Sequence, residues 1–150
     1  MDPSRARLIG KELQVALSSA DRSLYFHGTS MHPFLREGVL VIVRPVAWDE
    51  VRRGDIVTYR KDDKFPTRRV FDKRGDRLSL RCDGWKHLKF RVRRDEVLGR
   101  AEARFRDGQW ITQSSLEWRR AKWRAMAQAW RQTARRLWHS KRTRQWFARP

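Results

Sequence analysis

The sequence predicts a mainly β fold: a coiled β-sheet domain with a short helix before it and a long basic helix after it. Three observations lead to this prediction. The central part of the chain contains many short strand-like segments, turn signals rich in Gly and Asp separate them, and apolar residues at the end of the chain recur at helical spacing. Closely spaced short strands favour a compact barrel or coiled sheet over a βαβ fold.

Eight segments have the length and the β-branched or aromatic content of short strands. Turn signals such as Arg53-Gly54-Asp55 and Asp107-Gly108 lie between them. The predicted strands are Ser23–Phe26, Val39–Arg44, Ile56–Arg60, Thr67–Phe71, Arg77–Arg81, Lys89–Val92, Val97–Phe105 and Trp110–Thr112.

Helices are expected at both ends of the chain. Asp2 suits an N-cap, Pro3 suits the first helical position, and the apolar residues that follow share one face. Near the other end, Ser114 and Glu117 match a capping box, with Ser114 as the cap, and an apolar stripe runs from Trp123 to Trp138. The chain therefore divides into an N-terminal helix (1–22), a β domain (23–113) and a basic, Trp-rich helical tail (114–150).

Positive charge dominates the composition. The 150 residues include 36 Lys or Arg and 17 Asp or Glu, a net charge of +19. Residues 115–150 contain eleven Lys or Arg against the single acid Glu117, a net of +10, and they also hold five of the eight Trp. No apolar run approaches the roughly 20 residues of a membrane span, and no signal-peptide core is present. The single cysteine, Cys82, fits a reducing compartment, so we expect a cytoplasmic protein, with peripheral contact to a membrane as an option.

A serine in a constrained turn is the first candidate for chemistry. The segment Gly28-Thr29-Ser30-Met31-His32-Pro33 comes just before an apolar strand. Such a turn can fix Ser30 while its hydroxyl stays accessible, and nearby backbone N–H groups can form an oxyanion hole. Taken alone, the segment is better explained as an ordinary turn.

The motifs that follow change this interpretation. They are Gly54-Asp55-Ile56-Val57-Thr58-Tyr59, Arg69-Val70, Cys82-Asp83-Gly84 and Val97-Leu98-Gly99-Arg100, in this order. With the serine turn, the series resembles the S24/S26 serine peptidases, the group of signal peptidase I and LexA, and is most similar to the signal-peptidase branch. The resemblance implies the coiled β-sheet fold of that group. It also implies an endopeptidase that cleaves a leader or precursor peptide through an acyl-enzyme on Ser30, without metal or cofactor.

The resemblance also assigns supporting residues. Around Ser30 these are Gly28, Met31 and Pro33, and in the later motifs they are Gly54, Asp55, Arg69 and Asp83. We expect Asp55 to support the sheet as a turn residue. We expect Asp83 to pair with Arg69 and hold two strands together.

Two positions depart from the family's pattern: Cys82 stands where the family's Gly-Asp pair has its Gly, and the base position also differs. The family's general base, a Lys or His, stands just before the Arg-Val pair, where this chain has Arg68. Arginine keeps its proton in proteins, so Arg68 cannot accept the proton of Ser30. Either another residue acts as the base, or the protein is a pseudo-peptidase that binds peptides without turnover. The candidate bases are His27, His32, Lys64 and His87, and Cys82 is a remote alternative nucleophile.

The tail leaves three alternatives open. Its amphipathic helix covers an apolar surface of the β domain, or lies on an anionic membrane surface, or binds nucleic acid through Arg and Trp. We place nucleic acid last because no sequence-reading module accompanies it.

Overall fold

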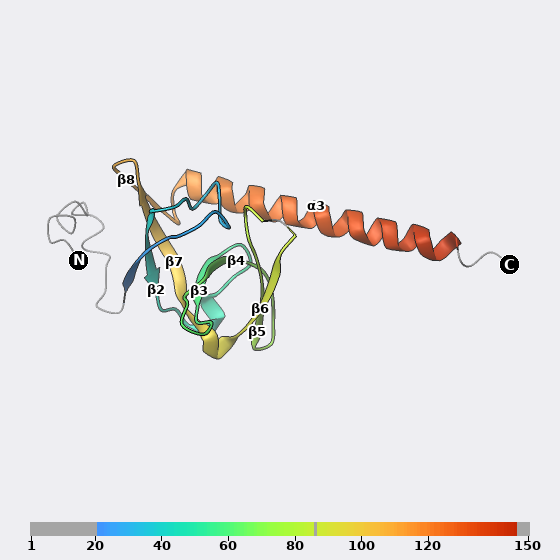
Figure 1. Cartoon of the computed structure of the whole chain (residues 1–150), viewed down its shortest axis with the longest axis horizontal. Helices are drawn as coiled ribbons and strands as arrows, with labels where there is room; N and C mark the ends of the chain where they lie inside the picture. The colour runs from blue at the N-terminus through green and yellow to red at the C-terminus, as the bar shows by residue number, and fades with distance from the viewer. Residues whose placement is uncertain (1–20, 86, 147–150) are drawn as a thin grey trace.

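The structure is a computed structural model that describes residues 21–85 and 87–146 (Figure 1). Within these residues it has eight strands, two short 3-10 helices and one long helix. The helix predicted over residues 1–22 lies outside the described residues apart from its last two positions, and Arg22 opens the first strand. The elements are β1 (Arg22–Tyr25), β2 (Leu40–Arg44), η1 (Trp48–Glu50), β3 (Ile56–Tyr59), β4 (Thr67–Arg74), β5 (Arg77–Arg81), β6 (Lys89–Arg93), η2 (Arg94–Glu96), β7 (Val97–Arg106), β8 (Gln109–Thr112) and α3 (Leu116–Trp146).

All eight strands join one antiparallel sheet, which confirms the mainly β prediction. Its order is β1-β2-β7-β3-β4-β5-β6, and β8 pairs with β7. Each predicted segment coincides with an observed strand. β4 runs three residues further than predicted because Asp72, Lys73 and Arg74 pair with the start of β5 across a hairpin.

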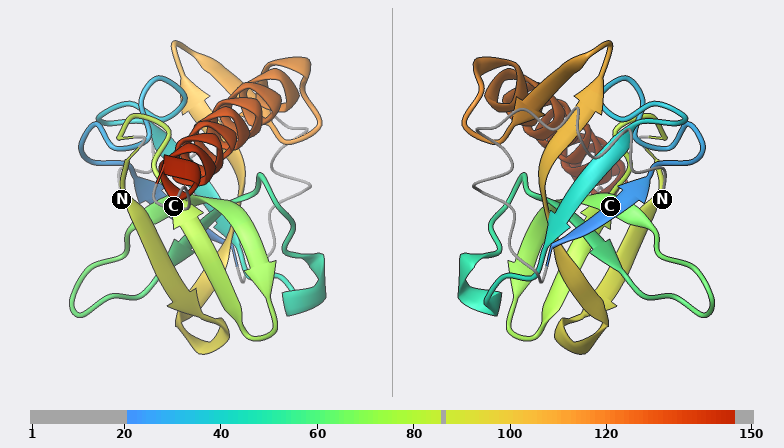
Figure 2. Two further views of the ribbon diagram at one scale, coloured as in Figure 1. Left: turned by 90° about the vertical axis from the view of Figure 1, so that its right-hand side faces the viewer. Right: turned by 90° about the vertical axis from the view of Figure 1, so that its left-hand side faces the viewer.

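The sheet curls because the two ends of the long strand β7 pair with different strands. One end of β7 pairs with β3, where Thr58 faces Gly99, and the other pairs with β2, where Leu40 faces Phe105. The register shifts once in each of these pairings, and such irregularities increase local twist. Figure 2 shows the strands wrapped around a shared interior with α3 along the upper side.

Two apolar clusters fill this interior. One contains Met31 and Leu35 of the loop between β1 and β2, so the segment that carries Ser30 is anchored in the core. The same cluster includes Trp118 of α3, whose ring meets Phe34 edge-on with 4.9 Å between centroids. The other cluster is built on β3–β6: Val51, Val57, Tyr59, Val70, Leu78, Leu80 and Val92.

Helix α3 begins one residue later than the predicted cap implies. Ser115, not Ser114, caps it: the Ser115 hydroxyl accepts a hydrogen bond from the Trp118 N–H at 3.2 Å. The predicted capping box is therefore wrong. Glu117 does not reach back to the cap, because its carboxylate pairs with Arg104 of β7.

The apolar stripe of α3 covers the β domain only in part: the Trp130 ring meets Phe71 of β4, and Met126 lines a small pocket with residues of β4 and β5. Trp118 and Ala129 are buried against the domain, whereas Trp123 is 75% exposed and Trp138 is 66% exposed. The helix therefore contacts the domain through large and small residues, whereas Trp123 and Trp138 at the two ends of the stripe remain exposed. No helix in the described part of the chain is long and apolar enough to cross a membrane.

Candidate active site

Ser30 lies in a tight loop between β1 and β2. The loop opens at Gly28, whose φ of +92° suits glycine. The His32 N–H donates to the Thr29 carbonyl at 3.0 Å, and the Leu35 N–H donates to the Met31 carbonyl at 2.9 Å. Ser30 itself is only 5% exposed, so the loop holds it in one place.

Glu37 fixes the start of this loop. Its carboxylate accepts hydrogen bonds from the Gly28 N–H and from Nδ1 of His27, the latter at 2.8 Å. The Gly28 hydrogen bond, followed by that from His27, holds the pKa of Glu37 below its ordinary value. The ring of His27 is thus directed to Glu37 through one of its two nitrogens.

The turn at Asp83 and Gly84 holds the loop from the other side. The Gly84 N–H donates to the Ser30 carbonyl at 2.8 Å. A Cβ on Gly84 would come within 2.6 Å of the Thr29 carbonyl oxygen, so only glycine allows this approach. The sequence interpretation missed Gly84 as a site residue. The dipeptide Asp83-Gly84 marks a turn and could have indicated this position.

An ion pair anchors that turn to β4. Arg69 Nε lies 2.8 Å from Asp83 Oδ1, and Nη2 lies 2.6 Å from Oδ2. Arg69 Nη1 also donates to the Gly54 carbonyl at 2.8 Å. Both side chains are almost fully buried. The pair therefore joins the Ser30 loop, the turn before β3 and strand β4.

Ser30 and Arg68 line one groove, which we call the Ser30 groove. Its volume is about 480 Å³. Its walls come from β1, β2, the Ser30 loop, the segment before β4, β4 itself and the segment between β5 and β6: Leu24, Tyr25, Phe26, His27, Gly28, Thr29, Ser30, Val41, Asp63, Lys64, Phe65, Pro66, Thr67, Arg68 and Trp85. Across the described residues, no side chain hydrogen-bonds the Ser30 hydroxyl.

Arg68 lies near the start of β4, in the wall of the Ser30 groove. It pairs with Val57 in the β3–β4 register, and its Nη1 donates to the Thr67 carbonyl at 2.7 Å. Its guanidinium carbon lies 5.2 Å from the centre of the Phe90 ring. Its Nε is buried and has no hydrogen-bond partner within the described structure. Arg68 thus brings a fixed positive charge and an unsatisfied donor to the groove.

Three of the four candidate bases line one of two grooves, and the fourth lines neither. His27 and Lys64 line the Ser30 groove, and both side chains are exposed. His32 and Pro33 line a neighbouring groove against α3 instead. His87 is exposed and lines neither groove.

Cys82 is buried beside the site. Burial raises the pKa of its thiol, and the nearby charge of Arg68 offsets part of this effect. Burial likewise raises the pKa of Tyr59, against the same charge of Arg68. A protonated, buried thiol is a poor nucleophile, so Ser30 remains the candidate.

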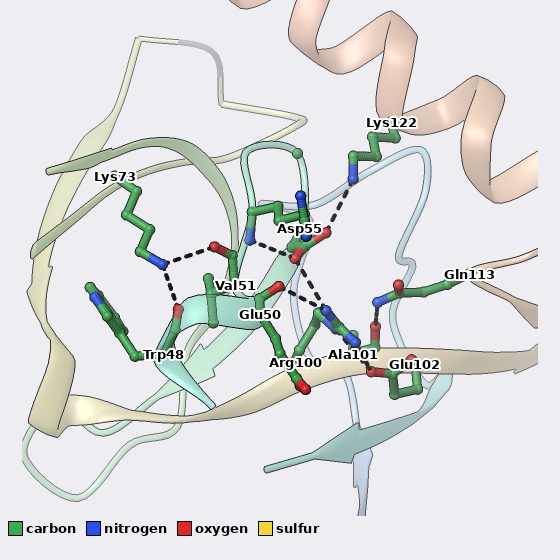
Figure 3. Close-up of polar contacts among 12 residues, drawn as sticks. Trp48, Glu50, Val51, Asp55, Lys73, Arg100, Ala101, Glu102, Gln113 and Lys122 are labelled. Carbon is green, nitrogen blue, oxygen red and sulfur yellow. Dashed lines mark hydrogen bonds and ion pairs between the residues drawn. The ribbon is translucent and has the colours of Figure 1, made fainter. Parts of the chain in front are cut away.

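Asp55 supports the sheet rather than the groove (Figure 3). One carboxylate oxygen accepts the Arg52 N–H at 2.9 Å, and the other accepts Lys122 Nζ at 3.1 Å. Arg100 of β7 lies 3.6 Å away. Gly54 precedes it in the same turn. Asp55 therefore ties the start of β3 to β7 and to α3.

No group of three metal-ligating side chains lies together in residues 21–85 and 87–138. The arrangement is instead that of a constrained serine facing a groove with a cation in its wall. The family model of the Peptidase S24-like proteins matches residues 8–101. This is more than half of the chain, and the chain belongs to the S24-like peptidase family. No curated protein matches the sequence.

Proposed function

We propose that this protein binds an extended leader or precursor peptide in the Ser30 groove, as a signal-peptidase-like member of its family, and that Arg68 keeps turnover absent or very slow. The observation that carries the proposal is that Arg68, at the family's base position, lines the same groove as Ser30. Membership of the S24-like family supports a serine-peptidase type of function in general.

The walls of the groove suit a peptide. Leu24, Phe26 and Val41 supply apolar contacts, and the rings of Phe65 and Trp85 are exposed at its rim. Apolar walls with a few fixed polar groups are typical of sites that bind a ligand's side chains and orient its backbone.

The chemistry of Ser30 and Arg68 explains how the groove can bind a peptide without cleaving it. Acylation of Ser30 requires that its proton move to a base as the oxygen attacks the peptide carbonyl. The Arg68 guanidinium stays protonated and cannot take this proton. It can donate hydrogen bonds to a peptide carbonyl or carboxylate. An acceptor that reached the buried Nε would also remove the cost, about 1–3 kcal/mol, of an unsatisfied donor.

A second candidate is an active peptidase whose base comes from another position. It is favoured by one observation: His27 and Lys64 also line the Ser30 groove. In that case Arg68 would orient the substrate or stabilise an oxyanion.

Two measurements on the full chain separate these candidates. A fluorophosphonate probe reports an activated serine, and a fluorescent peptide library panned on the protein reports binding. We expect peptides to bind, Phe65→Glu and Trp85→Glu to abolish binding, and the probe to label the wild type barely. Leu98→Glu, at an exposed apolar residue outside the groove, is the matched control.

Two results would contradict the proposal. Brisk labelling that disappears in Ser30→Ala would identify an active peptidase, and His27→Ala and Lys64→Ala would then locate the base. If no peptide binds, or if Leu98→Glu loses binding as much as the groove variants do, the Ser30 groove is not a peptide-binding site.

A further inference from the structure

The outward face of α3 carries a straight row of large apolar side chains. Leu116, Trp123, Trp130 and Leu137 recur every seven residues, and each is more than half exposed. Seven residues are close to two helical turns, so the row stays on one face. Trp138 lies beside its end. We call these five residues the outer stripe.

The outer stripe is long, and its members stay exposed although Trp130 also meets Phe71 of β4. From Leu116 to Leu137 the helix rises about 32 Å at ~1.5 Å per residue. Figure 1 shows α3 continuing well past the edge of the sheet. Single exposed apolar side chains are normal on a protein surface, but an aligned row of this length marks an interaction site.

Cations follow one side of the outer stripe. Arg120, Arg124 and Arg131 are exposed, and their helical positions place them along one flank of the row. Within the described residues, none of the three forms an ion pair with a carboxylate. Residues 116–138 contain seven Lys or Arg against one Glu, a net charge of +6.

A second group of cations lies where α3 crosses the ends of β5 and β6. Arg81 Nη2 donates to Thr133 Oγ1 at 3.2 Å, and Lys89 stands directly opposite Arg81 in the sheet. Arg136 follows Thr133 by one helical turn. Burial, followed by the charge of Arg136, lowers the pKa of Arg81. Burial lowers the pKa of Lys89, with further contributions from Arg81 and Arg136.

This cation group reaches the outer stripe through Phe71, and no carboxylate pairs with it in the part of the chain that the structure describes. Arg81 lies 3.9 Å above the ring of Phe71, and Phe71 meets Trp130 with 5.7 Å between ring centroids. Arg81 is 7% exposed, and its Nε has no hydrogen-bond partner in the described structure. Three like charges beside a row of Trp are stabilised by an external anion.

We propose that the outer stripe of α3 lies flat on an anionic membrane surface, with its apolar side chains at the headgroup–acyl boundary and the flanking cations on the lipid headgroups. An interfacial helix combines an apolar stripe, Trp at the boundary and Arg or Lys reaching to headgroups. Each cation near an anionic leaflet adds a favourable electrostatic contribution. The inference is independent of whether Ser30 is active.

Two other occupants fit the observations less well. A second copy of the chain would bring two Arg-rich flanks together. The second layer that a coiled coil needs is only partly apolar, since Arg119 and Thr133 stand in it beside Met126. Nucleic acid would engage Trp and Arg, but it would leave Leu116 and Leu137 in water. The aliphatic members of the stripe therefore favour lipid.

Vesicle flotation of the full-length protein tests the proposal. The vesicles are phosphatidylcholine alone, or phosphatidylcholine mixed with phosphatidylglycerol, at low and high salt. We expect flotation with the anionic vesicles, little with the neutral ones, and weaker binding as salt screens the exposed charges. No flotation with anionic vesicles at low salt would overturn the proposal.

Matched variants locate the contact. Trp123→Ser/Trp138→Ser removes two exposed side chains, and Arg120→Gln/Arg131→Gln removes two exposed charges, so neither disturbs the core. Each should weaken binding roughly tenfold or more. The controls are Leu98→Ser and Arg77→Gln. Arg77 is exposed at the opposite end of β5 from Arg81, and both controls should bind as the wild type does.

Equal binding by the stripe variants and the controls would overturn the proposal. So would a single-stranded oligonucleotide whose binding, measured by fluorescence anisotropy, is lost in the stripe variants while flotation is unchanged. A dimer in light scattering that dissociates in Trp123→Ser/Trp138→Ser, without any flotation, would assign the stripe to a second copy.

Discussion

Arg69 and Asp83 form a buried ion pair through two hydrogen bonds, of 2.8 and 2.6 Å, that connects the two halves of the candidate site. Arg69 follows Arg68 on β4, and Asp83 precedes Gly84, whose N–H holds the Ser30 carbonyl. The position of Ser30 relative to Arg68 therefore depends on this pair.

Asp83→Asn should destabilise the protein strongly. The substitution leaves the Arg69 charge buried without its counter-ion, and breaking a buried pair in this way costs about 3–5 kcal/mol. Urea unfolding followed by circular dichroism measures the change. The control is Asp76→Asn in the exposed Asp76–Arg77 pair, where we expect at most ~1 kcal/mol. Equal changes in the free energy of unfolding would mean that the buried pair contributes no more to stability than the exposed pair does.

Gly84→Ala should displace the Ser30 loop. The new Cβ would meet the Thr29 carbonyl oxygen at 2.6 Å, and neighbouring backbone cannot yield as a flexible side chain can. We expect weaker peptide binding in the Ser30 groove together with a lower midpoint of thermal unfolding. Gly75→Ala is the control, because a Cβ there meets nothing within 4 Å and changes only the backbone strain. Unchanged peptide binding in Gly84→Ala would show that the loop does not depend on this contact.

The sheet could be predicted from sequence because its signals are local. Strand composition and the intervening Gly and Asp turns located all eight strands, and the serine turn and Arg68 could be singled out from the order of motifs. The contact of Gly84 with Thr29 could not be predicted, because it joins segments far apart in the chain and depends on their folded approach.

The orientation of α3 could not be predicted for a different reason. Helical spacing shows which residues share a face, but it does not show which face meets the domain. The stripe from Trp123 to Trp138 left packing on the domain as one of three alternatives. In the structure Trp118 and Ala129 are buried, and Trp130 of the stripe meets Phe71. The cap was wrong by one residue because Ser114 and Ser115 offer the same chemistry, and Glu117 is drawn to Arg104.

Lowering the pH should loosen the start of the Ser30 loop. The Gly28 N–H and His27 hold the pKa of Glu37 below its ordinary value of 4.5 in the folded state. A depressed carboxyl pKa contributes stability that is present above 4.5 and is lost as the pH falls through the folded-state pKa. Hydrogen exchange of the Gly28 amide, read by NMR, should therefore accelerate below pH 4.5, apart from the intrinsic effect of pH on exchange. Glu37→Gln should remove this dependence, and the exposed Asp63→Asn should keep it.

Cys82 should react slowly with thiol reagents in the folded protein. Burial raises its pKa above the ordinary 9.0, and a buried thiol is also shielded from the reagent. At a mildly alkaline pH below 9.0, a chromogenic disulfide reagent should modify Cys82 far faster in urea than in buffer. Rapid modification of the folded protein would mean that the thiol is accessible, and Cys82 would return as a candidate nucleophile.

Arg68→Lys and Arg68→His should increase fluorophosphonate labelling of Ser30. Each puts a group that can lose its proton at the position where the family carries its base. General-base assistance is worth about 10²–10⁴-fold, so partial repair is measurable. Arg68→His should label more than Arg68→Lys at neutral pH, since the ordinary pKa of histidine is ~6.5 and its neutral form increases above that value. Labelling of Arg68→His should accordingly rise as the pH passes upward through this range.

Arg68→Gln is the control for these substitutions, because it removes the charge without adding a base. If Arg68 only blocks the reaction through its missing basicity, Gln leaves labelling as low as in the wild type, and Lys and His raise it. If all three variants increase labelling equally, the guanidinium excludes the probe by charge or size and the base lies elsewhere. The double variants with Ser30→Ala must lose the signal in every case, since only then does the label report Ser30. Labelling that is brisk in the wild type and unchanged by any substitution of Arg68 would make Arg68 a bystander and favour His27 or Lys64 as the base.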